Sequence, residues 1–163
     1  MAVVTADTGP LNYLAWIEAA EILPNLYGRI LIPSAVWEEL SHPKTPRIVR
    51  NCLGSAPAWL EVASLKQTVD PALAHLGRGE QEAITLSIER RADLLLIDER
   101  DGTRAASQCG LTVTGTLGVL DQAAARKWID LPTAFTKLEQ TSFRCPRVLM
   151  AALVEEDKRR KRT

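Results

Sequence analysis

The chain has 163 residues, of which 46% are apolar and 25% charged, and its 20 basic side chains are balanced by 20 acidic ones. This length fits one domain of ordinary size, and we expect a single domain over residues 1–163. Zero net charge excludes a protein that coats nucleic acid through bulk electrostatics, since that mode of binding requires an excess of Lys and Arg. It leaves open an enzyme of nucleic acid whose site is locally acidic.

The charge is uneven along the chain. Residues 1–40 contain five acidic side chains and one basic side chain, whereas residues 144–163 contain seven basic and three acidic ones. The basic run Lys158–Arg162 is expected to be a frayed, solvated end rather than a nucleic-acid contact.

Cysteine usage and hydropathy indicate a cytoplasmic protein without membrane contact. Cys52, Cys109 and Cys145 are far apart and lack C-x-x-C or Cys/His pairing, which disfavours a disulfide framework or a zinc site. The start of the chain has no basic region typical of a signal peptide. No apolar run approaches the roughly 20 residues that span a bilayer.

Short apolar runs alternate with helical patterns, which predicts βαβ units and an α/β fold with a mostly parallel sheet. The expected strands cover Ala2–Ala6, Arg29–Pro33, Leu60–Leu65, Leu94–Ile97 and Leu111–Thr114. The expected helices cover Leu11–Ala20, Ser34–Ser41, Pro46–Leu53, Gly79–Arg91, Arg100–Cys109, Thr116–Lys127, Thr133–Thr141 and Pro146–Arg160. Breaks are expected at Thr8–Pro10, His42–Pro46 and Gly77–Gly79.

Several common catalytic motifs are absent from the sequence. There is no G-x-x-x-x-G-K-[ST], which excludes a P-loop. Gly77-Arg78-Gly79 resembles the start of a dinucleotide fingerprint, but Glu82 replaces the third Gly and Glu80 adds an anion where pyrophosphate would lie. The only two histidines, His42 and His75, have no Ser or Cys nucleophile nearby, which argues against a hydrolytic triad.

Two aspartates directly follow expected strands. Asp7 follows Val3–Ala6 and Asp98 follows Leu94–Ile97. In open α/β sheets, sites form outside the carboxyl ends of the strands, at the point where the strand order switches. Taken alone, each aspartate is better read as the N-cap of the next helix.

Two glutamates lie on the apolar sides of expected helices. At 100° per residue, Glu80 opens an apolar stripe that continues with Ala83, Ile84, Ser87 and Ile88. Glu82 falls on the opposite side and is expected to face solvent. In the helix after Pro33, Glu39 lies beside Val36 on the apolar side, whereas Glu38 points away. The helix dipole favours an acid in the first turn, but it does not explain why Glu80 lies on the buried stripe.

Four carboxylates that converge at one sheet edge repel each other unless a cation is present. Oxygen ligands without His or Cys suit Mg²⁺ or Mn²⁺. Such a site activates water and stabilises both oxygens of an in-line phosphoryl displacement. The pattern therefore predicts metal-dependent phosphodiester hydrolysis, in which Asp7, Glu39, Glu80 and Asp98 are both metal ligands and catalytic residues.

Five segments in order resemble the motifs of the PIN-domain nucleases, in particular a prokaryotic branch similar to the VapC-type toxins. These segments are VVTADTGPLNYLA, LIPSAVWEEL, LGRGEQEAITLS, LLLIDERDGTRAA and TVTGTLGVLDQA. The resemblance covers residues 2–127, and FRCPRVLMAAL resembles the terminal helix of that branch. It implies a three-layer α/β/α fold whose five-stranded sheet has the order 3-2-1-4-5. It also implies that the four acids of the family correspond to Asp7, Glu39, Glu80 and Asp98.

The resemblance also implies an activity and partners. It implies a Mg²⁺- or Mn²⁺-dependent endoribonuclease acting on RNA, the toxin of a type II toxin–antitoxin pair, with an antitoxin partner and a homodimer. Glu80 departs from the Asp usual at its position, which shifts a metal by about one C–C bond. A further acid of the family corresponds to Glu99 or Asp101, and Thr116 stands where a polar neighbour of the ligands occurs.

Other readings remain open beside this one. A haloacid-dehalogenase phosphatase requires D-x-D after the first strand, and Gly9 at the second Asp position counts against it. A non-catalytic module of the same fold, which binds RNA or protein and uses the acids as caps, stays an alternative. Arg100 and Arg104 are candidate phosphate contacts or part of a solvated helix face. Tyr13 and Trp16 serve a dimer or antitoxin contact, or pack in the core.

Overall fold

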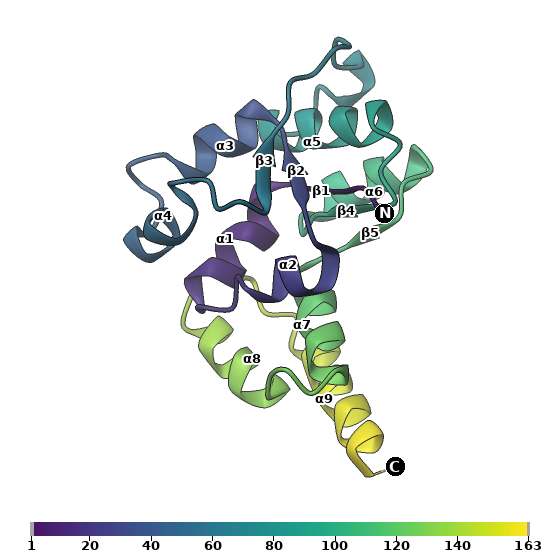
Figure 1. Ribbon diagram of the computed structural model, residues 1–163. Helices are drawn as coiled ribbons and strands as arrows, with labels where there is room; N and C mark the ends of the chain where they lie inside the picture. The colour runs from purple at the N-terminus through teal and green to yellow at the C-terminus, as the bar shows by residue number, and fades with distance from the viewer. Residues whose placement is uncertain (1, 163) are drawn as a thin grey trace. The chain divides into compact units, whose positions relative to one another are not determined.

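A computed structural model describes residues 2–162 and contains a five-stranded parallel sheet with helices on both faces, in a three-layer α/β/α arrangement (Figure 1). The strands are β1 Val4–Ala6, β2 Ile30–Ile32, β3 Leu60–Val62, β4 Leu94–Leu96 and β5 Val113–Thr114. Their order in the sheet is β3-β2-β1-β4-β5, and all neighbours are parallel. The expected fold class and strand order are confirmed.

The helices alternate with the strands as the sequence indicates. They are α1 Thr8–Trp16, α2 Ile22–Tyr27, α3 Ser34–Leu40, α4 Arg47–Leu53, α5 Arg78–Glu89, α6 Arg100–Gln108, α7 Thr116–Ala125, α8 Leu131–Glu139 and α9 Arg147–Arg162. A 3₁₀ turn covers Pro71–Leu73. No helix in residues 2–162 is long and apolar enough to cross a membrane.

The chain forms two compact units, which divide after Thr116. The first contains the sheet, and the second begins at Leu117 and is helical. That residues 1–163 act as a single domain stays a prediction.

β1 is the central strand of the sheet. It pairs with β2 on one side, where Val4 is opposite Ile30, and with β4 on the other, where Ala6 is opposite Leu96. β1 and β2 are buried along their whole length, as expected for parallel strands that are covered on both faces. The buried hydroxyl of Thr5 on β1 is satisfied by the Ser87 hydroxyl on α5, 2.6 Å away.

The first helix begins earlier and ends earlier than the expected Leu11–Ala20. It starts at Thr8 and includes Pro10, because the first turn of a helix has no use for the missing N–H of proline. It ends at Trp16, and Glu18 then adopts a positive φ of 60°. The break expected at Thr8–Pro10 was therefore wrong, and the helix follows Asp7 without a gap.

Charged contacts order the end of the helical second unit. The carboxylate of Asp157 is 2% exposed and lies 2.9 Å from Arg160 Nη2 and 2.8 Å from Lys161 Nζ. Arg160 also pairs with Asp121 of α7 at 2.9 Å. The basic run is thus helical to Arg162 and not frayed as expected, while four of its five side chains are exposed to solvent, as the sequence analysis expected.

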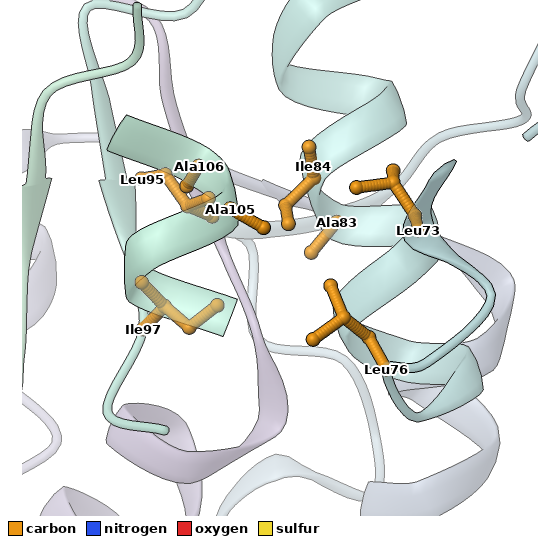
Figure 2. Close-up of a cluster of buried hydrophobic side chains, with 8 residues drawn as sticks. All are labelled: Leu73, Leu76, Ala83, Ile84, Leu95, Ile97, Ala105 and Ala106. Atoms are coloured by element: carbon orange, nitrogen blue, oxygen red, sulfur yellow. The ribbon is translucent and has the colours of Figure 1, made fainter. Parts of the chain in front are cut away.

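An apolar cluster joins α5 to β4 and α6 (Figure 2). Its buried members are Leu73, Leu76, Ala83, Ile84, Leu95, Ile97, Ala105 and Ala106. Ala83, Ile84 and Ser87 are buried as expected, but Ile88 is 44% exposed. Ile88 lies about 80° around the helix from Glu80, at the edge of the predicted stripe, which explains the difference.

This packing predicts unequal costs for two substitutions on the same helix. Ile84→Ala leaves a cavity in the cluster and is expected to lower the free energy of unfolding by about 3 kcal/mol. Ile88→Ala, one turn further along, is expected to cost less than about 1 kcal/mol because the side chain is exposed. Urea unfolding of the full chain measures both, and equal costs would contradict this account of the core.

Candidate acidic active site

The four acids expected from the sequence line one pocket in the first unit. Asp7 directly follows β1, and Asp98 lies two residues beyond β4. Glu39 comes from the last turn of α3 and Glu80 from the first turn of α5. The pocket has a volume of about 250 Å³. The structure therefore brings together all four side chains that the sequence analysis selected.

The backbone of α5 approaches these carboxylates closely at Gly79. A Cβ there would lie 2.6 Å from Oε1 of Glu39, which would have to shift, and 3.3 Å from Oδ1 of Asp7, which is a tight contact. The two carboxylates thus face the same point of α5. This close approach accounts for a glycine at position 79 of the Gly77-Arg78-Gly79 sequence. Its presence does not require a dinucleotide-binding role.

Two threonines orient carboxylates of the pocket. Asp98 accepts hydrogen bonds from the backbone N–H of Thr116 and from its hydroxyl, both at 2.7 Å. The hydroxyl of Thr8, which directly follows Asp7, donates to Oε2 of Glu39. Thr116 therefore lies beside the acids, as the sequence analysis expected.

The capping alternative fits the two aspartates unequally. Asp7 occupies the N-cap position of α1; its side chain makes no cap hydrogen bond further into the helix, but its carboxylate interacts with the backbone N–H of Thr8, the first residue of α1. Asp98 precedes Glu99, the N-cap residue of α6, and accepts its hydrogen bonds from Thr116. The Asp98 carboxylate is therefore held at the pocket by Thr116 and not by a helix cap.

Carboxylates dominate the charged groups that line the pocket. Among its described lining residues there is no Lys, Arg or His, and Glu99 adds a fifth carboxylate. Asp7 is only 5% exposed, and this burial raises the pKa of Asp7 to about 7. The backbone N–H of Thr8 opposes the rise in pKa, while the charges of Glu80, Glu39 and Asp98 add to it.

Two further carboxyl groups of the pocket share this behaviour. Burial raises the pKa of Asp98 above its usual range, although the hydrogen bonds from Thr116 oppose the rise. Burial also raises the pKa of Glu80, and the charge of Glu99 is the next largest cause. Asp101 does not line the pocket, but its charge contributes to the raised pKa of Glu80.

The residues present fit a hard divalent cation by donor chemistry and charge. The pocket offers carboxylate oxygens, which Mg²⁺ and Mn²⁺ prefer, and a cation would offset the burial and the like charges that raise the pKa of Asp7. Among residues 2–162, however, no three His, Cys, Asp or Glu side chains are gathered closely enough to form a ready-made metal site.

Sequence reasoning missed two residues on the wall of the pocket. Asn12 and Tyr13 of α1 line it together with Thr8. The signal was available, because in a helix that begins at Thr8 residue 12 lies one turn after Thr8, and residue 13 lies one turn after Gly9, which also lines the pocket. Tyr13 is stacked on Trp16, with ring centroids 6.1 Å apart and 7° between the planes. Arg100 and Arg104 are exposed on α6 and do not line the pocket.

Comparisons with known proteins give a matching family model and a similar solved structure. The chain matches the family model DUF3368, described as PIN domain, over residues 3–159. It is similar in structure to a PilT N-terminus domain protein from the hyperthermophilic archaeon Sulfolobus solfataricus P2, with 17% sequence identity and a TM-score of 0.46. That similarity covers 89% of this chain and 100% of the other. No curated protein matches the sequence.

Burial of the Asp7 carboxylate predicts that its neutral replacement stabilises the metal-free protein. Between the ordinary pKa of 3.8 and the folded value of about 7, the folded state holds more protons than the unfolded state. The free energy of unfolding therefore falls as pH rises through this window, and the full penalty is present above pH 7. The penalty amounts to about 4 kcal/mol at most.

We expect Asp7→Asn to raise the Tm in EDTA at pH 8, and the gain over wild type to shrink by more than half at pH 5. Thermal unfolding followed by circular dichroism measures this difference. Asp93→Asn is the control: it changes an exposed acid before β4 but keeps an oxygen acceptor for the backbone N–H of Val3, so it is expected to leave the Tm nearly unchanged. A variant less stable than wild type at pH 8, or a gain independent of pH, would contradict the burial argument.

Proposed function

This chain belongs to the PIN-domain family, and on that premise we propose that it is a metal-dependent ribonuclease that hydrolyses phosphodiester bonds at the acidic pocket. The family gives the chain a nuclease-type fold. The observation that carries the proposal is the convergence of Asp7, Glu39, Glu80 and Asp98 on one pocket that has no Lys, Arg or His among its described lining residues. A phosphate, itself an anion, would enter such a pocket only together with a cation.

The proposed roles of the chain's residues follow from their contacts. Asp7, Glu39, Glu80 and Asp98 would hold Mg²⁺ or Mn²⁺, which supplies Lewis-acid stabilisation of phosphate oxygens and lowers the pKa of water. Thr116 fixes both oxygens of Asp98, and Thr8 orients Glu39. These hydrogen bonds hold the carboxylates at the pocket before a cation arrives.

The wall formed by α1 favours a nucleic acid over a small phosphate ester. The Tyr13 ring lines the pocket, and its stacking on Trp16 creates a partly buried aromatic surface beside the acids. Bases of single-stranded nucleic acid stack on such surfaces regardless of sequence. Asn12 adds an amide that can donate to a phosphate or accept from a base.

The proposed biological role is that of the toxin of a type II toxin–antitoxin pair, with a homodimer and an antitoxin partner. It rests on the likeness of the sequence motifs to VapC-type toxins. The alternative is a non-catalytic module of the same fold that binds RNA or protein. That alternative is favoured by one observation, namely that residues 2–162 contain no ready-made cluster of three metal ligands.

Cleavage of a single-stranded RNA tests the proposal. Wild type is expected to cleave in Mg²⁺ or Mn²⁺ and not in EDTA, while Asp7→Asn and Asp98→Asn are expected to cleave no faster than wild type in EDTA. Asp93→Asn, at the opposite end of β4, should keep the wild-type rate. Cleavage that resists EDTA, or wild-type rates in both pocket variants, would refute the proposal. RNA binding without cleavage would favour the non-catalytic module.

A further inference from the structure

We propose that Glu82 is a positioning residue that holds α3 against α5 and thereby sets the spacing of Glu39 and Glu80 across the pocket. The inference rests on the proposed function, since it concerns the affinity of the same site for a divalent cation. The sequence analysis expected Glu82 to face solvent, and this expectation is wrong. Its side chain is only 15% exposed because α3 packs against that side of α5.

One oxygen of Glu82 caps the N-terminus of α3. Oε1 accepts a hydrogen bond from the backbone N–H of Ala35 at 3.1 Å. The N-cap residue of α3 is Pro33, whose side chain has no acceptor for the N–H groups of the first turn. Glu82 therefore supplies from α5 the acceptor that the sequence of α3 lacks.

The other oxygen of Glu82 connects to the far end of α3. Oε2 lies 3.1 Å from Nε of Arg78, and Nη1 of Arg78 lies 2.7 Å from Oε2 of Glu38. Glu38 directly precedes Glu39 in the sequence. The chain of contacts thus runs from Ala35 through Glu82 and Arg78 to the residue next to the pocket acid.

The two contacts of Glu82, with Ala35 and with Arg78, differ in strength. Arg78 and Glu38 are 64% and 58% exposed, and ion pairs so exposed to water contribute little. The bond to Ala35 is shielded and involves a charged acceptor, so it is the stronger contact. We therefore assign the positioning role to Glu82 and a lesser one to Arg78.

The charges in the pocket tend to separate α3 from α5. Glu39 and Glu80 carry like charges on two helices, and their repulsion favours separation of α3 from α5. In the other direction, the backbone of α5 at Gly79 approaches Oε1 of Glu39 so closely that no side chain would fit between them without a shift of Glu39. Glu82 acts on the far side of α5 from Glu80 and opposes the separation without entering the pocket.

The test compares Glu82 with a matched glutamate on the same helix. Glu89 also accepts backbone hydrogen bonds, from Lys66 at 2.9 Å and from Gln67, but it lies at the other end of α5. The variants are Glu82→Ala, Glu82→Gln and Glu89→Ala in the full chain. Two quantities are measured: the dissociation constant for Mn²⁺ by electron paramagnetic resonance, and amide hydrogen exchange at Ala35 without metal.

We expect Glu82→Ala to weaken Mn²⁺ binding about tenfold, the scale on which outer contacts of metal ligands act, and to speed exchange at Ala35. Glu82→Gln keeps an oxygen acceptor for Ala35 and is expected to restore most of the affinity. Glu89→Ala should change neither quantity, even where it lowers the Tm as much as Glu82→Ala does. A merely structural role of Glu82 would not produce this separation.

Three results would overturn the inference. Wild-type affinity in Glu82→Ala refutes it and leaves the proposed function intact. Equal weakening by Glu82→Ala and Glu89→Ala shows a general loss of stability instead of positioning. Absence of Mn²⁺ binding in wild type refutes the proposed function, and the positioning role falls with it.

Discussion

The parallel pairing of β1 with β4 is the constraint on which the site depends. The backbone N–H of Asp7 donates to the carbonyl of Leu96 at 2.8 Å, so the two strand ends are locked in register. From β1 the chain adds β2 and β3 on one side, and β4 and β5 extend the other. The order switches between β1 and β4, and the pocket containing Asp7 and Asp98 lies where a parallel sheet leaves a crevice.

This arrangement concentrates negative charge where the fold can least solvate it. Desolvation of Asp7 is the largest cause of its raised pKa, and three other acids of the pocket add to it. The metal-free fold thus carries a local penalty that its apolar strands and the cluster around Ile84 must offset. Functional sites commonly depart from the features that stabilise the rest of a protein. Here the departure is a group of like charges at a partly buried site, where buried charges are normally paired with opposite ones.

Much of this could be predicted from the sequence because strand ends and helix faces follow simple periodicities. Asp7 and Asp98 were found by position after apolar runs, and Glu39 and Glu80 by their side of a helix. The helical periodicity that located Glu80 gave the wrong exposure for Glu82, because it assumes that a helix has one buried face. α5 contacts both the sheet and α3. Asn12 and Tyr13 were missed because Gly9-Pro10 was taken as a break instead of a first turn.

The central claim is that the acidic pocket holds a divalent cation, and thermal unfolding with and without Mn²⁺ at pH 8 tests it most directly. A ligand that binds only the folded state raises the Tm as its concentration passes the dissociation constant. The account predicts that millimolar Mn²⁺ raises the Tm of wild type, and that the rise disappears when Asp7 and Asp98 are both changed to Asn. No stabilisation of wild type, or an equal rise in the double variant, would contradict it.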